Sequence, residues 1–560
     1  MALTLNRWIR LDLSTVSLPV GAGPLLQEHP IIRAAGDGTT TVREHNEIHY
    51  DTPDLQLYRH RLALTLNRRG EQWIQRFGVE EGSESDQKWV ETPIPDQQLD
   101  LKTIRKTPLF PALNGQDART LAPVFTLHCR EQQWALHFPG GLSILLKEER
   151  GYLKFGATRQ PFHELVLARQ AGEEARWFQT ALELAQALVP PDKGGGKMGS
   201  PERGGPGLIA TTPVTRGFAW LEPTLLLPSF REKGASGAGG SPGERGLDGA
   251  PAALQVEMTV RQAFVSLCAG LLQQMQVWQG AVLYGGKQAK LAGVQQLYQT
   301  TGRLYTLVFL YDTLLPRAVG TELDEELTWL LKELALVQEC QALLTETLEP
   351  LTEQFATHPG LEELLLKTRN GLILAIKRLE RSLVSFRYTR LLLGLENWLT
   401  GHLWDFLLDP AQRTELDLPV MRLVADWLQQ CHTQVRKRGR KWSDLDLAGR
   451  IALRDDIDRM MHATLLFADL FARKKPETTG RLRPPDALLS FQECLQRLQG
   501  TMHLLVNVQT SSRFLTRGGS GRDGAQPVQE WQEARVQRRL ADAGREWELF
   551  AGKLAFWQQG

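Results

Sequence analysis

The densest group of residues able to do chemistry is the basic run RKRGRK, which contains Arg436, Lys437, Arg438, Arg440 and Lys441. Lysine and arginine side chains bind phosphate oxygens, and each contact with a polyanion releases counterions. The run also follows an amphipathic segment, and cations near a helix C-terminus are stabilised by the helix dipole. It is therefore either a phosphate-binding site or a solvated helix end. The helix end is the favoured interpretation, because such placement is common.

A second basic set runs along one predicted helix between residues 361 and 402. Within it, Lys377 and Arg381 are four residues apart and share a helix face. A polyanion track and an exposed bundle face would both look like this. Glu380 interrupts the positive run, which favours the exposed face.

Three aspartates, Asp455, Asp456 and Asp458, lie close together in the sequence. Asp455 and Asp458 share a helix face, but no Glu or His at a fixed spacing completes an oxygen cage for a metal. We interpret the group as a charged surface turn. The motifs HExxH, GxSxG and GxxxxGK[ST] do not occur in a credible context, so the common metalloprotease, hydrolase and P-loop sites are not predicted.

Composition limits the class of protein. The 560 residues contain 65 Lys plus Arg and 64 Asp plus Glu, so the global charge does not indicate a polyanionic partner. Hydrophobic residues make up 42%, which is typical of folded protein. The five cysteines are far apart and form no CxxC pair, which suits a reducing cytosol. We therefore expect a cytoplasmic location.

Membrane and nucleic-acid roles are not expected. The first residues resemble no secretory leader, and nowhere do 18 uncharged apolar residues run together. The 15 tryptophans fall mainly on apolar helix faces and are not interleaved with basic residues. Core packing explains them better than base stacking does.

The N-terminal part is predicted to consist of antiparallel strands. Short β-rich segments with turn signals between them occur at 47–51, 62–67, 72–77, 124–128, 134–138, 142–146, 152–155 and 162–167. RRGE at 68–71 is typical of a tight hairpin connection, and 173–189 has the period of an amphipathic helix. This pattern predicts a barrel or a rolled sheet.

The rest of the chain has a helical period. We expect long helices, packed as antiparallel bundles, over residues 260–282, 289–315, 324–351, 361–402, 418–436, 445–473, 486–508 and 530–557. Stretches rich in Gly, Pro and Ser separate the parts. The fold class is thus α+β, with an antiparallel barrel followed by an all-α region.

Two segments carry a resemblance to known families. The segment YDTPDLQLYRHRLALTLNRRGEQWIQRF, at 50–77, resembles the second to fourth strands of CYTH domains, the triphosphate-tunnel fold. The helical segments at 294–310, 329–344 and 495–505 resemble CHAD domains. The order CYTH then CHAD resembles bacterial inorganic triphosphatases. Together with the Gly- and Pro-rich stretches, it predicts a domain at 1–225 with a flexible insert at 190–207, a linker at 226–252, a helical domain at 253–515 made of two four-helix units, and a linker and helix at 516–560.

The resemblance implies a tunnel in which basic residues hold a triphosphate and carboxylates hold Mg²⁺ or Mn²⁺. The residues it assigns to catalysis are Arg7, Arg76, Arg130 and Glu164, with Glu164 also the metal ligand. Most other charged positions are replaced: Leu3 and Leu5 on the first strand, Thr65 and Asn67 on a later one, and Ser143 and Leu145 on another. In the helical part, Arg303 is the residue that stays basic on the first matching helix, and it joins the phosphate-binding set named above.

The sequence therefore predicts a CYTH–CHAD protein that binds phosphate compounds, such as tripolyphosphate or polyphosphate, or serves as a scaffold, with impaired catalysis. Losing several charge-assisted contacts of about 1.5–3 kcal/mol each would slow hydrolysis by many orders of magnitude. Two alternatives stay open. One is an active, metal-dependent inorganic triphosphatase that cleaves tripolyphosphate to diphosphate and phosphate. The other is a helical module that binds a partner protein.

Overall fold

The computed structural model describes residues 8–14, 30–79, 89–105, 120–189, 205–222, 254–355, 361–401, 404–471, 473–474, 482–483, 486–517 and 525–558. Arg7, the predicted linker at 226–252 and most of the predicted insert at 190–207 lie outside these residues. The described chain forms two compact units. The first comprises residues 1–248, 276–293 and 381–401, and the second comprises residues 249–275, 294–380 and 402–560. The boundaries expected from the sequence at 225, 252 and 515 stay predictions.

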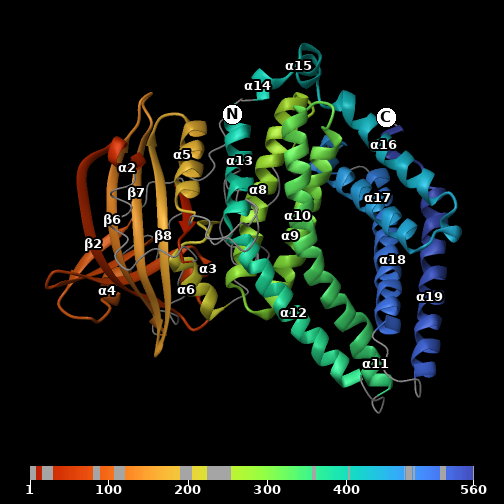
Figure 1. Cartoon of the computed structure of the whole chain (residues 1–560). Coiled ribbons are helices and arrows are strands. Elements are labelled where there is room, and N and C mark those ends of the chain that lie inside the picture. The colour runs from red at the N-terminus through yellow and green to blue at the C-terminus, as the bar shows by residue number, and fades with distance from the viewer. Residues whose placement is uncertain are drawn as a thin grey trace. The chain divides into compact units, whose positions relative to one another are not determined.

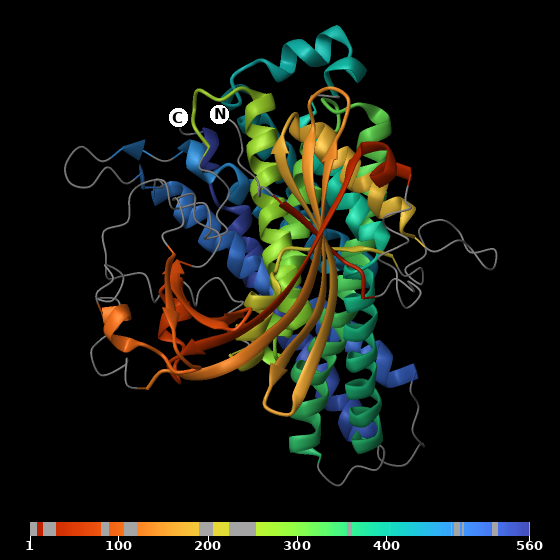
Figure 2. The ribbon, with the colours of Figure 1, turned by 90° about the vertical axis from the view of Figure 1, so that its left-hand side faces the viewer.

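A nine-stranded antiparallel sheet forms the centre of the first unit (Figures 1 and 2). Its strands lie in the order β5-β4-β3-β2-β6-β7-β8-β1-β9. They are β1 (Trp8–Asp12), β2 (Gly36–Asp51), β3 (Leu62–Arg69), β4 (Gln72–Val79), β5 (Val90–Ile94), β6 (Ala122–His137), β7 (Ser143–Phe155), β8 (Thr158–Ala171) and β9 (Gly207–Ile209). In the described part of the chain no pairing joins β5 to β9, so strand pairing there does not close the sheet into the expected barrel. The α+β class is confirmed.

Two strands are longer than the sequence pattern predicts. The segments expected at 124–128 and 134–138 are one strand, β6, and those expected at 142–146 and 152–155 are one strand, β7. Gly151 permits this continuity, because a Cβ there would lie 1.8 Å from the carbonyl oxygen of His128 on the neighbouring strand. The expected hairpin at RRGE is confirmed, with Gly70 in the left-handed region at φ 66°.

The YDTPD segment has a structural role. The Asp51 carboxylate is fully buried and accepts hydrogen bonds from the backbone N–H groups of Thr52, Leu57 and Tyr58, at 2.7, 2.9 and 2.9 Å. These bonds hold the first turn of the short helix α3 (Gln56–Arg59) directly after β2. Burial raises the pKa of Asp51, although the backbone hydrogen bonds oppose this shift.

Short helices accompany the sheet. They are α2 (Pro30–Ala35), α4 (Leu101–Arg105), α5 (Glu174–Ala187) and α6 (Pro213–Leu221). Helix α5 packs against β8, where the Arg169 guanidinium lies 5.7 Å from the ring centroid of the fully buried Trp177. Helix α6 begins after Thr212, whose side chain accepts a hydrogen bond from the Thr215 N–H, and it packs against β6.

The remaining described chain is mainly helical, as predicted, apart from a short antiparallel pair of strands, β10 (Arg473–Lys474) and β11 (Leu482–Arg483). The helices are α8 (Val260–Tyr284), α9 (Lys287–Leu310), α10 (Arg317–Ala342), α11 (Glu349–Gln354), α12 (Leu361–Leu383), α13 (Phe386–Thr400), α14 (Trp404–Leu407), α15 (Pro410–Leu416), α16 (Met421–Gly439), α17 (Leu447–Leu466), α18 (Asp486–Arg517) and α19 (Ala525–Ala551). The helix expected at 361–402 is divided into α12 and α13 at Ser385, which has an extended backbone and whose hydroxyl accepts a hydrogen bond from the Tyr388 N–H. None of the described helices is long and apolar enough to span a bilayer.

Within the first unit, polar contacts join the helical stretches 276–293 and 381–401 to the strand β9 and the residue before it. The Thr389 hydroxyl of α13 donates to the Pro206 carbonyl and accepts from the Leu208 N–H, both at 2.8 Å. The Gln279 amide donates to the carbonyls of Leu208 and Leu383. Because these groups are buried, their polar atoms need partners within the protein, and the hydrogen bonds hold β9 against α13.

Helix α13 packs against α5 with two carboxyl groups between them. Glu396 is 3% exposed, and one oxygen of Glu396 and one of Glu174 are buried without a hydrogen-bond partner. Burial raises the pKa of Glu396 to about 8, and the charge of Glu174 contributes to the rise. Glu396 is therefore largely protonated in the folded protein at neutral pH.

We expect this unit to lose stability as the pH rises. A carboxyl group with a folded-state pKa of about 8 keeps a proton that the unfolded chain releases near 4.5, so the free energy of unfolding falls between these two pH values. The slope approaches about 1.4 kcal/mol per pH unit. Glu396→Gln should remove this slope and raise stability above pH 8. Urea unfolding across this pH range measures it, with the exposed Glu183→Gln on α5 as the control. An equal slope in wild type and Glu396→Gln would contradict the prediction.

Candidate functional site

One face of the sheet carries a continuous set of charged side chains. The pairing register places Arg10 opposite Val166, Glu149 opposite Glu164, and Glu131 opposite Glu149. Paired residues point to the same side of a sheet, so charges from neighbouring strands collect on one face. Charged and histidine residues on this face of the described strands include Arg10, Asp12, Arg43, His45, Glu47, His49, Arg69, Arg76, Glu91, Glu131, His137, Lys147, Glu149 and Glu164.

Glu164 lies at the centre of this network. Its carboxylate is fully buried, and each of its oxygens accepts a hydrogen bond from a guanidinium: Oε2 from Arg10 of β1 and Oε1 from Arg216 of α6. Arg10 also donates to Glu149 at 2.6 Å. Burial would lower the pKa of Arg10 and Arg216, but the charges of the glutamates outweigh it and raise both. Both guanidiniums therefore stay charged.

Helix α6 covers part of the charged face with apolar side chains as well as Arg216. Phe218 stacks on Tyr58 at 4.2 Å between ring centroids and meets Phe125 edge-on at 5.1 Å. Gly217 lies directly over Phe125, where a Cβ would approach the ring to 2.6 Å. The hydroxyl of Tyr284 accepts a hydrogen bond from Arg216 at 3.4 Å. The helix thus fills this part of the face with packed side chains.

The acids farther along the face also have basic partners. Glu131 accepts from Lys147 at 3.2 Å, and His45 lies 3.6 Å from it. Burial alone would raise the pKa of Glu131, but His45 and Lys147 lower it to about 2. Glu47 pairs with Arg76 at 3.5 Å. The acids are thus neutralised by protein cations.

This arrangement does not fit a bound Mg²⁺ or Mn²⁺. A hard cation needs several free oxygen ligands, whereas both oxygens of Glu164 are already held by arginines. In the described part of the chain, no three His, Cys, Asp or Glu residues are grouped so that they could hold a metal ion.

A hollow of about 580 Å³ opens on the same face beside this network. Two of its lining residues on this face, Arg10 and Lys147, are cationic, and one, Glu149, is acidic. Arg169 also lines the hollow, but it pairs with Ile144 on the opposite face, where its guanidinium lies beside Trp177. Trp8, Leu145, Val166, Ala168 and Gln170 complete the lining. The net charge of these lining side chains is therefore positive, although the six acids named on the face outnumber its five Lys and Arg residues.

The structure does not bring together the three predicted catalytic residues that it describes, Arg76, Arg130 and Glu164. Glu164 and Arg76 share the charged face, but Arg76 is on β4 and pairs with Glu47 and Glu91, five strand positions away from β8. Arg130 is exposed on the opposite face, because it pairs with Arg150, whose neighbour in β8 is His163. Arg7 lies outside the described residues.

Sequence reasoning missed Arg10, Lys147, Glu149, Glu131 and Arg216. In WIRLD the apolar residues Ile9 and Leu11 alternate with the others and are buried. This alternation could have placed Arg10 on the same face of the strand as Trp8 and Asp12. Lys147 and Glu149 follow Ser143 and Leu145 on the same side of β7, beyond the point where the predicted strand ends. Arg216 has no such signal, since it comes from a helix distant in sequence.

The predicted phosphate-binding residues of the helical part lie on three helices. Arg303 is on α9, Lys377 and Arg381 are exposed on α12, and the basic run ends α16. Arg436, Lys437, Arg440 and Lys441 are exposed, as expected of a solvated helix end. Arg438 differs from them, because its side chain bonds to the buried Asp456.

Helices α9 and α17 pack closely where the CHAD resemblance implies a basic surface. His462 of α17 lies against Gly302 of α9, where a Cβ would be 2.7 Å from its ring. Its nitrogens contact Thr306 at 3.3 Å and Gln299 at 3.1 Å. Burial lowers the pKa of His462 to about 4, so it is neutral. Burial also lowers the pKa of Arg303.

Comparison with known proteins identifies the helical part. Residues 267–506 match the family model of the CHAD domain, so the chain contains a CHAD domain in its C-terminal part. The crystal structure of the CHAD domain from the plant Ricinus communis is 19% identical, with a TM-score of 0.42, and covers 54% of this chain and 93% of its own. No curated protein matches the chain.

The sheet part is similar to two solved structures. A Hippeastrum protein with a dominant triphosphatase activity is 16% identical, with a TM-score of 0.21, over 34% of this chain and 91% of its own. A candidate adenylate cyclase from Bacillus halodurans is 11% identical, with a TM-score of 0.21, over 34% of this chain and 94% of its own. At these identities and TM-scores, the likenesses establish no function for this chain.

We predict that Arg216→Ala destabilises the sheet, because Glu164 would keep Arg10 but lose its second buried partner. Breaking a buried ion pair costs about 3–5 kcal/mol, and the lower end applies here because one guanidinium stays. Hydrogen exchange of the β1 and β8 amides measures the loss. Arg130→Ala, on the exposed opposite face, should change it by less than about 0.5 kcal/mol. Equal effects of the two substitutions would contradict the prediction.

Proposed function

We propose that the sheet unit binds a short phosphate compound, such as tripolyphosphate, without hydrolysing it. The observation that carries the proposal is the double arginine partnership of Glu164, which leaves its carboxylate no free oxygen for a metal ion. Metal-assisted phosphoryl transfer needs a hard cation on oxygen ligands to neutralise the developing charge. Binding needs cations alone, and Lys147 and Arg10 line an open hollow.

Charge favours a short ligand over a long one. On the charged face the hollow is lined by two cations and one acid, whereas the strands beyond it alternate acids with bases. A long polyphosphate on the charged face would meet Glu131 and Glu47. A compact tripolyphosphate fits within the positive part, and the resemblance of YDTPD and its hairpin to CYTH domains supports this choice of ligand.

His45 gives the proposed site a pH dependence. Its hydrogen bond to Glu131 raises the pKa of His45, so the ring gains positive charge as the pH falls through neutrality. His45 faces Oε1 of Glu131 and Lys147 bonds to Oε2. A protonated His45 therefore offsets part of the carboxylate charge that holds the lysine, and leaves Lys147 freer for a phosphate oxygen. Tripolyphosphate should therefore bind more tightly at mildly acidic pH.

Calorimetric titration with tripolyphosphate, with and without Mg²⁺ or Mn²⁺, tests the proposal. We expect binding without release of phosphate, and about tenfold or more weaker binding in Lys147→Gln, since a charge-assisted contact contributes about 1.5–3 kcal/mol. Lys154→Gln is the matched control, because Lys154 is exposed on the opposite face of the same strand.

Metal-dependent release of phosphate that is lost in both Glu164→Ala and Glu164→Gln would overturn the noncatalytic part and favour an inorganic triphosphatase. Circular dichroism of both variants would confirm that the sheet still folds. Equal affinity in Lys147→Gln and Lys154→Gln would overturn the assignment of the site.

A further inference from the structure

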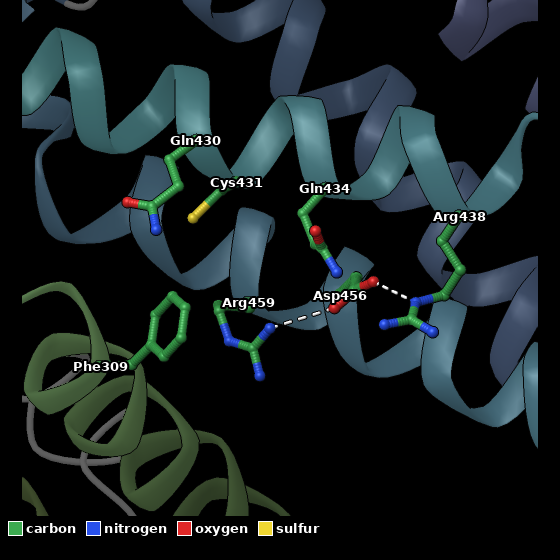
Figure 3. A pocket seen from close by; sticks show the side chains of 7 residues that line it. All are labelled: Phe309, Gln430, Cys431, Gln434, Arg438, Asp456 and Arg459. Atoms are coloured by element: carbon green, nitrogen blue, oxygen red, sulfur yellow. Dashed lines mark hydrogen bonds and ion pairs between the residues drawn. The ribbon is translucent and has the colours of Figure 1, made fainter.

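The helical unit contains a hollow of about 330 Å³ between α9, α16 and α17 (Figure 3). Its lining residues are Phe309, Gln430, Cys431, Gln434, Arg438, Asp456 and Arg459. Pockets for small molecules begin near about 300 Å³, so the size suits a compact ligand.

Asp456 fixes two guanidinium groups at this hollow. Its carboxylate is 5% exposed and accepts from Arg438 Nε at 2.5 Å and from Arg459 Nη1 at 3.1 Å. Figure 3 shows the two arginines on either side of Asp456. Neither donates its remaining N–H groups to another described residue, and Arg459 Nε is buried without a partner. Asp456 thus holds both guanidiniums in place, and their other N–H groups are available to donate hydrogen bonds to a ligand.

The net charge of the side chains that line the hollow favours a ligand with a single negative charge. Two guanidiniums and one carboxylate leave a net charge of about +1, which a monoanion neutralises, whereas a dianion would leave an uncompensated charge in a partly buried site. A planar carboxylate also fits the forked donors of a guanidinium. Gln430 and Gln434 lie one turn apart on α16 and line the same hollow with amide donors.

The other wall is apolar. The Phe309 ring is 41% exposed, and the Arg459 guanidinium lies 4.4 Å from its centroid. Cys431 also lines the hollow, and burial raises the pKa of its thiol to about 11, so it adds no charge. We propose that this hollow binds a small monocarboxylate, with its carboxylate on Arg438 and Arg459 and its apolar part on Phe309.

Calorimetric titration of the full chain with benzoate and with 3-phenylpropionate tests the proposal. We expect 1:1 binding, at least about tenfold weaker in Arg438→Gln, because a charge-assisted contact is lost. Lys437→Gln is the matched control, since it removes the same charge from the exposed neighbouring position and should change affinity less than about twofold. Benzamide, the neutral analogue, should not bind measurably.

Asp456→Asn provides a second variant if Arg438→Gln fails to fold. It keeps the shape of the side chain but raises the net charge to about +2, so preference should shift from benzoate toward inorganic phosphate. Preferential binding of phosphate by the wild type, equal loss in Arg438→Gln and Lys437→Gln, or no binding of either acid would overturn the proposal. These outcomes leave the tripolyphosphate site untouched, because its variants lie on β7.

Discussion

A buried charge must be neutralised where it lies, and this constraint organises the sheet unit. Glu164 is fully buried, so its carboxylate requires partners that cannot be supplied by water. Arg10 supplies one from the neighbouring strand and Arg216 supplies the other from a helix distant in the chain. The ion pairs therefore link β1, β8 and α6 into one arrangement, and the same bonds occupy the oxygens that a metal ion would need.

The helical unit contains the same combination of charges, one buried carboxylate with two guanidiniums. In the sheet one carboxylate has two guanidiniums, of which that of Arg216 is enclosed by the rings of Tyr284 and Phe162, while Arg10 lines the hollow on the charged face. In the helices Asp456 also has two guanidiniums, but these line an open hollow. A buried acid with two arginines serves packing in the first case and leaves donors available to a ligand in the second. The difference is how much of each arginine the surrounding elements cover.

Several features of the fold follow from local sequence. Alternating β-formers indicated β3, β4 and β8, and the RRGE turn was predicted with its hairpin. The helical period gave α8, α16 and α18 to within a few residues at their starts. The errors arise where a polar stretch continues a strand, as at Glu131 to Gln133, and where one hydroxyl, that of Ser385, caps the start of a new helix within a predicted one. The alternation of apolar residues in strands and their helical period do not predict either effect.

By itself, the sequence determined the α+β class, the hairpin, the helical second half and the basic helix end at Arg436 to Lys441. These depend on residues near one another in the chain. Tertiary structure alone decided which charges meet, because Glu164 with Arg216, and Asp456 with Arg438, are joined across elements. A carboxylate in a sequence is a candidate metal ligand until its partners are known. Two guanidiniums brought from other elements turn it into part of an ion-pair network.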